Sequence, residues 1–187
     1  MTPKHVIVMA KAPVPGRVKT RLCPPCTPVS AAAVAEACLA DTLDAVACCR
    51  AEYKVLALDG PVGPWLPAGF QVIEQRGDGL AARLANAWKD TAALTGGNGL
   101  QIGMDTPQTT SAELDILLDL VGQSRSVLGP AVDGGWWVIG LCGTDPDLVF
   151  RGVAMSDRDT GRAQAERLRS LGLDVVTAPA HRDIDTV

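Results

Sequence analysis

One short basic segment constrains this chain more than any other, Lys11-Ala-Pro-Val-Pro-Gly-Arg-Val-Lys-Thr-Arg-Leu22. It follows directly on the apolar run His5-Val-Ile-Val-Met9, which is typical of a buried strand. Its prolines and glycine restrict the backbone, so four mutually repelling cations are held together. Open α/β sheets bind phosphates at the carboxyl ends of their strands. The segment therefore predicts an α/β fold with a phosphate site after the first strand.

The cations of this segment are Lys11, Arg17, Lys19 and Arg21, with Pro15 and Gly16 between them. The segment has neither the Gly-x-x-x-x-Gly-Lys-Ser/Thr pattern of a P-loop nor the Gly-x-Gly-x-x-Gly pattern of dinucleotide-binding folds. We therefore expect side-chain ammonium and guanidinium groups, more than backbone amides, to bind the phosphates. The alternative is a solvated basic loop without a ligand.

Composition narrows the class of protein further. A chain of 187 residues with 47% hydrophobic and 20% charged residues predicts one compact domain over residues 1–187. A net charge of -4 argues against a nucleic-acid partner. No apolar run approaches the ~20 residues that span a bilayer. The five apolar residues before Lys11 are too few for a signal peptide, so we expect a cytoplasmic location.

The six cysteines do not form an obvious metal site. Cys23 and Cys26 have the Cys-x-x-Cys spacing of metal and redox sites, but no second spaced pair follows. We expect free thiols in a reducing compartment, with Cys38 and Cys49 in the core. A metal or redox role for Cys23 and Cys26 is the alternative.

Strand and helix patterns alternate along the chain. Strands are predicted over 5–9, 53–58, 70–74, 100–104, 126–128, 136–141 and 174–177, and helices over 29–49, 79–94, 111–121 and 160–171. This alternation predicts a Rossmann-like, mostly parallel sheet with helices on both faces. The short spacing between 126–128 and 136–141 indicates a late antiparallel excursion. A flavodoxin-like strand order is the alternative.

Asp105 follows a predicted central strand, in Gly103-Met-Asp-Thr-Pro107. A carboxylate in this position lies on the ligand side of a parallel sheet. Mg²⁺ and Mn²⁺ prefer carboxylate oxygens and often bridge them to phosphates. We therefore interpret Asp105 as a metal ligand. The alternative is a cap on the following helix, for which Thr109 and Ser111 are better placed.

Two further segments carry candidate site residues. In Gly129-Pro-Ala-Val-Asp-Gly-Gly-Trp-Trp137, adjacent glycines allow close approach of a ligand to the backbone. Asp133 could bind an acceptor hydroxyl, contact the metal indirectly or act as a base, or this stretch could be only a tight Asp-Gly turn. In the last segment, 182–187, Asp183 and Asp185 stand at positions i and i+2 of an extended segment and therefore point the same way. Either could complete a metal site with Asp105; the alternative is a frayed acidic tail.

Together these segments resemble the DUF2064 group of the GT-A (nucleotide-diphospho-sugar transferase) superfamily. The resemblance rests on the basic segment 11–22, on 103–107, on 129–141 and on Arg182-Asp-Ile-Asp-Thr186. It implies a single GT-A domain that binds a nucleotide through Mg²⁺ or Mn²⁺. It also implies the following roles: phosphate binding by Arg17, Lys19 and Arg21, metal binding by Asp105 and Asp185, and acceptor binding by Gly134 and Gly135, beside which Asp133 and Trp136 stand.

The sequence departs from the superfamily pattern in two places. It ends at Val187 without the Pro-Glu-Asp that usually follows Asp-Thr, so we expect Asp185 to be weakly anchored. It has Asp105-Thr-Pro where most glycosyltransferases of the superfamily have Asp-x-Asp. The second departure favours nucleotidyl transfer from an NTP to a small phosphorylated acceptor, with Lys19, Asp105 and Asp133 as catalytic candidates.

Two other functions stay open. The family resemblance also fits glycosyl transfer from a nucleotide-sugar donor, including transfer related to arsenosugar synthesis. The missing end of the C-terminal motif fits a nucleotide-binding protein without catalysis. The nucleobase, the acceptor and the oligomeric state carry no signal in the sequence.

Overall fold

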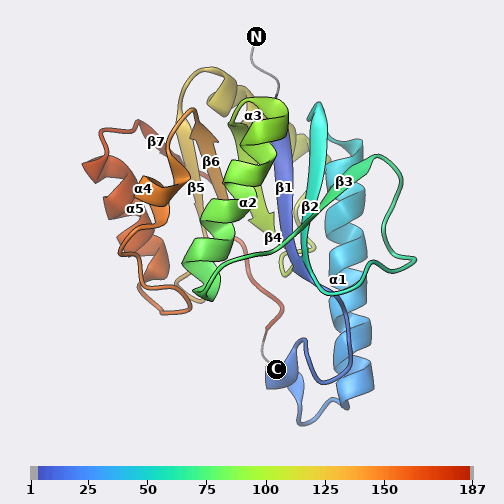
Figure 1. The fold of residues 1–187 in the computed structure, drawn as a ribbon. Coiled ribbons are helices and arrows are strands. Elements are labelled where there is room, and N and C mark those ends of the chain that lie inside the picture. The colour runs from blue at the N-terminus through green and yellow to red at the C-terminus, as the bar shows by residue number, and fades with distance from the viewer. Residues whose placement is uncertain (1–3, 186–187) are drawn as a thin grey trace.

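The structure is a computed structural model that describes residues 4–185; Thr186 and Val187 of the last motif lie outside this range. Its elements follow the order shown in Figure 1. These are β1 (Lys4–Lys11), η1 (Thr20–Leu22), α1 (Pro28–Cys48), β2 (Tyr53–Asp59), β3 (Phe70–Glu74), α2 (Gly79–Thr95), β4 (Asn98–Gly103), α3 (Ser111–Gly122), β5 (Ser126–Pro130), β6 (Trp136–Cys142), α4 (Pro146–Phe150), α5 (Thr160–Ser170) and β7 (Val175–Thr177).

One sheet contains the seven strands of the described chain, in the order β3-β2-β1-β4-β6-β5-β7. All neighbouring strands are parallel except at β6, which runs antiparallel to both β4 and β5. The predicted mostly parallel sheet with a late antiparallel excursion is confirmed. The order is not flavodoxin-like, because β1 lies between β2 and β4 with β3 beyond β2.

Helices cover both faces of the sheet, as predicted. Side chains of β1 alternate between two hydrophobic clusters, because successive residues of a strand point to opposite faces. Val6 and Val8 pack in the cluster that includes α1 and α3, whereas Ile7 and Met9 pack in the cluster that includes α2, α4 and α5. Figure 1 shows α2, α4 and α5 in front of the sheet and α1 behind it.

Local signals placed most element boundaries within one or two residues. Thr27 followed by Pro28 is a favourable helix start, and in the structure Thr27 caps α1: its side chain accepts a hydrogen bond from the Ser30 amide. The cap of α3 is Thr110, one residue before the predicted Ser111. Helix α4 was not predicted, because its five residues are too few to show a helical period. No helix in the described range is long and apolar enough to cross a membrane.

Candidate functional site

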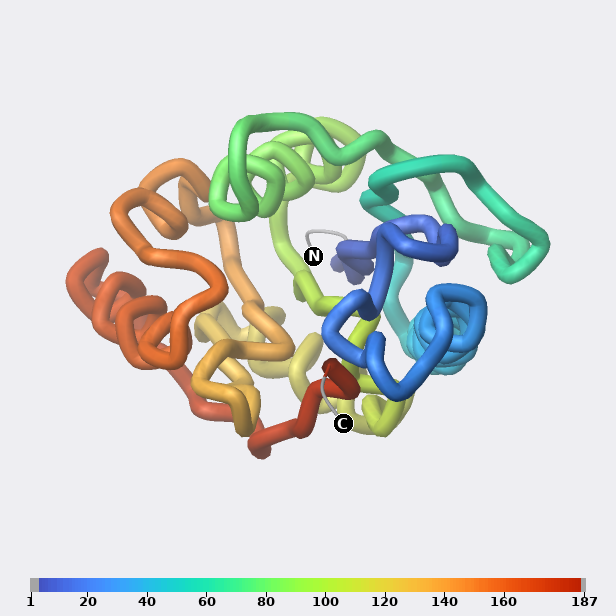
Figure 2. The backbone as a smooth tube through the Cα atoms, turned by 90° about the horizontal axis from the view of Figure 1, so that it is seen from below, coloured from blue at the N-terminus to red at the C-terminus, as the bar shows by residue number. Residues whose placement is uncertain are grey.

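A cleft of about 840 Å³ opens at the carboxyl ends of β1 and β4. It is bordered by the basic segment, the end of β4, the loop before β6 and the last described residues. Figure 2 shows the blue loop that follows β1 close to the red C-terminal segment. The candidate residues in its lining are Lys11, Arg17, Lys19, Arg21, Asp105, Asp133, Gly135, Trp136 and Asp185. Four segments that are distant in sequence therefore meet at one edge of the sheet.

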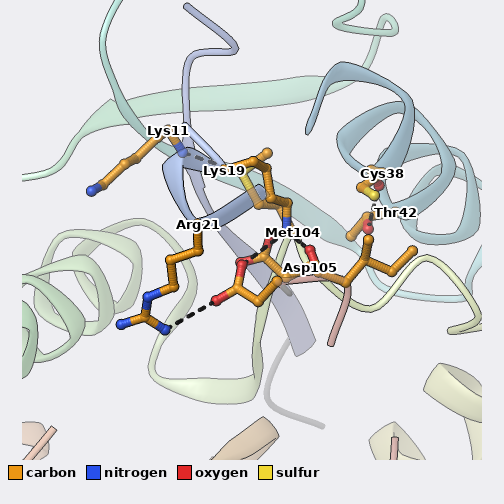
Figure 3. Close-up of polar contacts among 9 residues, drawn as sticks. Lys11, Lys19, Arg21, Cys38, Thr42, Met104 and Asp105 are labelled. Atoms are coloured by element: carbon orange, nitrogen blue, oxygen red, sulfur yellow. Dashed lines mark hydrogen bonds and ion pairs between the residues drawn. The ribbon is translucent and has the colours of Figure 1, made fainter. Parts of the chain in front are cut away.

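Lys19 lies at the centre of this convergence (Figure 3). Its Nζ donates hydrogen bonds to Asp105 Oδ1 and to the Ile184 carbonyl, and lies 3.2 Å from Asp185 Oδ1. Only 3% of its side chain is exposed. Burial acts to lower the pKa of Lys19, but its two carboxylate partners outweigh burial and raise that pKa. Lys19 is therefore a charged group that pairs with carboxylates in this structure, and phosphate binding by Lys19 stays a prediction.

The backbone of Lys19 is also unusual. Its φ of 49° and ψ of 33° place it in the left-handed region, where it precedes the short helix η1. A residue with a Cβ adopts this conformation at an energetic cost, and such residues concentrate at functional sites. The turn around Lys19 thus aims the side chain from the basic segment toward the end of β4.

The other cations of the basic segment remain available to a ligand. Lys11 and Arg17 are exposed and line the cleft, and Figure 3 shows the Lys11 side chain directed away from Asp105. Arg21 is 71% exposed, with Nη1 3.8 Å from Asp185 Oδ2. A contact at this distance in water is weak. These three side chains form an exposed positive rim around the buried Lys19 side chain.

Pro15 and Gly16 shape the segment without lining the cleft. The Arg17 amide donates to the Val14 carbonyl at 3.0 Å, which closes a turn across these two residues. Gly16 has a φ of +80°, a conformation that glycine adopts without strain. In this structure they orient Arg17, and direct phosphate contact by Pro15 and Gly16 stays a prediction.

Asp105 is held in place from two directions. Its side chain accepts from Lys19, and its backbone carbonyl accepts from the Ile184 amide at 2.9 Å. Burial raises the pKa of Asp105, and the neighbouring Lys19 opposes that rise. The same contacts hold residues 184 and 185, so the expected weak anchoring of Asp185 is not observed. Asp185 is tied to the basic segment through Lys19 and Arg21.

Asp183 is the most perturbed carboxyl group of the cleft. Burial, followed by the charges of Asp133 and Asp105, raises its pKa to about 7. Its Oδ1 is buried and has no hydrogen-bond partner within residues 4–185. The sequence offered Asp183 only as an alternative to Asp185, on the basis of their spacing. The structure instead brings both residues to the cleft.

The loop between β5 and β6 combines a turn with a cleft wall. Asp133 Oδ1 accepts from the Gly135 amide at 2.9 Å, so the tight turn is formed and Asp133 still borders the cleft. Gly134 instead packs against the backbone at Arg158, because a Cβ on Gly134 would lie 1.9 Å from the Arg158 carbonyl oxygen. Gly135 and Trp136 line the cleft. The close approach to Arg158 gives Gly134 a packing requirement, and its acceptor role stays a prediction.

Sequence reasoning missed residues on the opposite wall. Gln75 lines the cleft, and its Nε2 donates to the carbonyls of Ala10 and Ala57 at 2.9 Å each. Arg83 pairs with Asp59 at 2.9 Å, also in the lining. None of these residues stands in a recognisable motif. The strand-end position of Asp59 was the one available signal, because it follows the second strand as Lys11 follows the first.

The carboxylates suit a hard cation that is shared with a substrate. Within residues 4–185 no group of three or more His, Cys, Asp or Glu side chains is arranged as a complete metal site. Mg²⁺ is commonly held by one or two carboxylates together with substrate phosphates. Asp105 and Asp185 converge on one cation, and the unpartnered oxygen of Asp183 lies nearby, so the donor set fits such an ion.

The cysteines contribute no partner to this donor set. Cys23 and Cys26 are free thiols on a partly exposed loop. Cys38 and Cys49 are buried, as predicted, and burial raises the pKa of both thiols. A high pKa disfavours the reactive thiolate. Their burial is consistent with a packing role.

Known structures share this architecture. A candidate nucleotide-diphospho-sugar transferase from Desulfovibrio desulfuricans G20 superposes with a TM-score of 0.88 at 25% identity, over 100% of this chain and 84% of that one. This chain also superposes on Rv0371c from Mycobacterium tuberculosis H37Rv in complex with manganese. The TM-score is 0.54 at 19% identity, over 100% of this chain and 93% of that one. CMP:2-keto-3-deoxy-manno-octonic acid synthetase complexed with CTP gives 0.61 at 11% identity, over 99% and 94%.

The last two likenesses, both below 25% identity, show the fold alone. No curated protein matches the chain by sequence. The profile of one family, described as an uncharacterized protein conserved in bacteria, matches residues 32–157, about two thirds of the chain. Together with the strand order and the edge of the sheet at which its four motifs meet, this match shows that the chain belongs to the DUF2064 family.

Proposed function

We propose that this protein is a metal-dependent transferase that moves a nucleotidyl group from an NTP to a small phosphorylated acceptor. One observation carries the proposal: a cluster of cations and the carboxylates Asp105 and Asp185 share one large cleft. Nucleotidyl transfer needs the charge of a triphosphate to be neutralised and its α-phosphorus to be positioned for attack. The proposed location of both tasks is the carboxyl edge of β1 and β4.

The chain's own residues divide these tasks. Lys11, Arg17 and Arg21 would bind the phosphates from the open side of the cleft, where their side chains are exposed. Asp105 and Asp185 would hold Mg²⁺ or Mn²⁺, which supplies neutralisation of phosphate charge when bound. In the transfer an oxygen of the acceptor phosphate forms a bond to the α-phosphorus. The bond from that phosphorus to the bridging oxygen breaks, and pyrophosphate leaves.

The loop before β6 would hold the acceptor. Asp133 and Gly135 border the cleft on the side opposite Gln75, and Trp136 adds a partly buried aromatic surface. The Asx turn fixes the Asp133 carboxylate through the Gly135 amide, so that carboxylate has a defined orientation. A small acceptor with a hydroxyl group next to its phosphate would find a hydrogen-bond acceptor there.

Glycosyl transfer from a nucleotide-sugar is the second candidate. It is favoured by the likeness to the D. desulfuricans protein, with 25% identity and a TM-score of 0.88. Both values exceed those of two other similar structures, a 4-diphosphocytidyl-2C-methyl-D-erythritol synthase and a 2-C-methyl-D-erythritol 4-phosphate cytidylyltransferase. The same cations would then stabilise a leaving nucleoside diphosphate. A cleft of about 840 Å³ falls within the range of ligand pockets and could hold either donor.

Two measurements test the proposal. Thermal unfolding is first followed with each of the four NTPs and with a panel of nucleotide-sugars, with and without Mg²⁺, because ligands that bind the folded state raise Tm. The stabilising donor is then incubated with phosphorylated acceptors and the released product is identified. Pyrophosphate supports nucleotidyl transfer, whereas a nucleoside diphosphate supports glycosyl transfer. Stabilisation without turnover of any donor would favour a nucleotide-binding protein without catalysis.

A further inference from the structure

The contacts of Lys19 resemble the coordination of a metal ion more than a surface ion pair. Three oxygens from two parts of the chain converge on one ammonium group, from Asp105, Ile184 and Asp185. Two of them are carboxylate oxygens and the third is a backbone carbonyl, which are the donors that hard cations choose. The Lys19 side chain is 3% exposed, so water does not supply alternative partners.

The two carboxylates need a cation to lie this close together. Without one, like charges at a partly buried site repel each other. Lys19 supplies that charge in the absence of any ligand. A divalent ion bound to the same oxygens and the Lys19 ammonium would repel each other, so the two cations exclude one another from this position.

We propose that Lys19 is a built-in cation that occupies the metal position and must leave it when a metal–phosphate complex binds. This inference rests on the proposed function and specifies how that site is regulated. Lys19 also lines the cleft that holds Arg17 and Arg21, so the displaced ammonium remains within the phosphate site. Metal alone binds weakly, because it must evict a cation without offering that cation a new partner. Metal with phosphate binds well, because the phosphate receives the displaced Lys19.

The test measures binding of Mn²⁺ alone, by electron paramagnetic resonance of the free ion and by calorimetry, to the wild type and to Lys19→Met. Methionine has a similar length and no charge, so the carboxylates lose their internal cation. We expect Lys19→Met to bind Mn²⁺ at least tenfold more tightly than the wild type. Asp105→Asn in the Lys19→Met background should abolish this gain. Arg169→Met, which removes an exposed cation outside the cleft with no ion pair in the described range, should change the affinity less than twofold.

A purely structural ion pair predicts a different result. In that case Lys19→Met would lose stability and bind Mn²⁺ no better than the wild type, which would overturn the proposal. Circular dichroism and the Tm of each variant show whether it folds. If Lys19→Met does not fold, Lys19→Gln replaces it, with the same expectation for Mn²⁺.

A second titration separates this inference from the proposed function. The 1:1 complex of Mn²⁺ with inorganic pyrophosphate is titrated into the wild type and Lys19→Met. We expect the wild type to bind the complex much more tightly than Mn²⁺ alone, and Lys19→Met to show a smaller difference. Binding of the complex by the wild type, without a gain in Lys19→Met for Mn²⁺ alone, overturns the displacement and leaves the metal–phosphate site intact. No binding of either probe to any of the proteins overturns both.

Discussion

The two ends of strand β1 differ in the charge of their buried polar groups. At the amino end, His5 is fully buried, with its Nδ1 2.8 Å from Thr95 Oγ1 and its ring edge-on to Trp88 at 4.9 Å. Burial lowers the pKa of His5 to about 4, so the ring is neutral. At the carboxyl end, Lys19 stays charged between Asp105 and Asp185 beside an open cleft.

This difference favours the carboxyl end as the location of a ligand. An unpaired polar atom occurs at each end, His5 Nε2 and Asp183 Oδ1. A neutral ring nitrogen packed against an aromatic side chain is a modest cost of a closed core. Asp183 has a carboxyl oxygen without a hydrogen-bond partner, and three other carboxylates raise its pKa, so a nearby cation would stabilise its ionised form. The amino end therefore has the contacts of a closed core, whereas the carboxyl end has a polar atom without a partner in the described range.

The largest expected effect follows from removing a charge at the carboxyl end. Asp105→Asn should lower the affinity for the stabilising nucleotide in the presence of Mg²⁺ by about 100-fold or more, because the cation loses its principal carboxylate. Calorimetric titration measures this loss. Asp119→Asn is the matched control. Asp119 pairs with Lys4 near the amino end of β1, so this substitution should leave nucleotide binding unchanged. Equal losses in both variants would contradict the assignment of the site.

Two glycines test how tightly each end is packed. Gly99→Ala would place a Cβ 2.2 Å from the His5 carbonyl oxygen, and Gly134→Ala would place one 1.9 Å from the Arg158 carbonyl oxygen. Neither backbone can yield easily, so each substitution should lower the free energy of unfolding by on the order of 3 kcal/mol. Chemical denaturation measures the change. Gly103→Ala is the control, because a Cβ there meets no atom within 4 Å.

The buried histidine predicts acid sensitivity. The folded-state pKa of His5 is about 4 against an unfolded value of 6.5, so the unfolded state binds more protons between these values. Stability should therefore fall as pH decreases from 6.5 to 4, by up to about 3 kcal/mol. Denaturation at a series of pH values measures the slope, and His5→Gln should flatten it. An unchanged slope in His5→Gln would show that another group causes it.

Asp183 predicts the opposite slope at the other end of the sheet. Its folded-state pKa of about 7 exceeds the unfolded value of 3.8, so the folded state binds the extra proton. Its contribution to stability is present at pH 4 and is lost as pH rises to 7. Asp183→Asn should be more stable than the wild type at pH 8, by on the order of 1 kcal/mol or ~3 °C in Tm, because partial exposure reduces the effect. At pH 4 the two proteins should unfold alike, and a difference of equal size there would rule out this cause.

The smallest expected effect comes from the lysines at the two ends of β1, the exposed Lys11 and the partly buried Lys4. Lys11→Ala should weaken binding of the triphosphate about fivefold, because a solvated cation contributes about 1 kcal/mol to an anion contact. Lys4→Ala removes the same charge from the opposite end and should not affect binding. The affinity for the nucleoside alone is the second control, since Lys11 is expected to contact phosphate. An equal loss for nucleoside and triphosphate would place Lys11 elsewhere in the site.

Much of the fold followed from patterns within short stretches of sequence. The apolar run after His5, the Thr27-Pro28 helix start and the spacing between 126–128 and 136–141 were sufficient for strand β1, helix α1 and the antiparallel excursion. Local propensity and periodicity act over a few residues, so they can be detected without knowledge of contacts. The cleft position of Asp105 was likewise predictable, because it follows a buried strand of a parallel sheet.

The sequence by itself determined which segments carry charge and at which edge of the sheet they end. Only the tertiary structure decided how these charges pair. Lys19 meets Asp105 and Asp185, which are 86 and 166 positions away. The pKa of Asp183 is raised mainly by burial and by the charges of Asp133 and Asp105, and Gly134 packs against Arg158, all of which lie in other segments of the chain. The physical reason is that burial and Coulomb interactions depend on distance in space, which local sequence patterns do not encode.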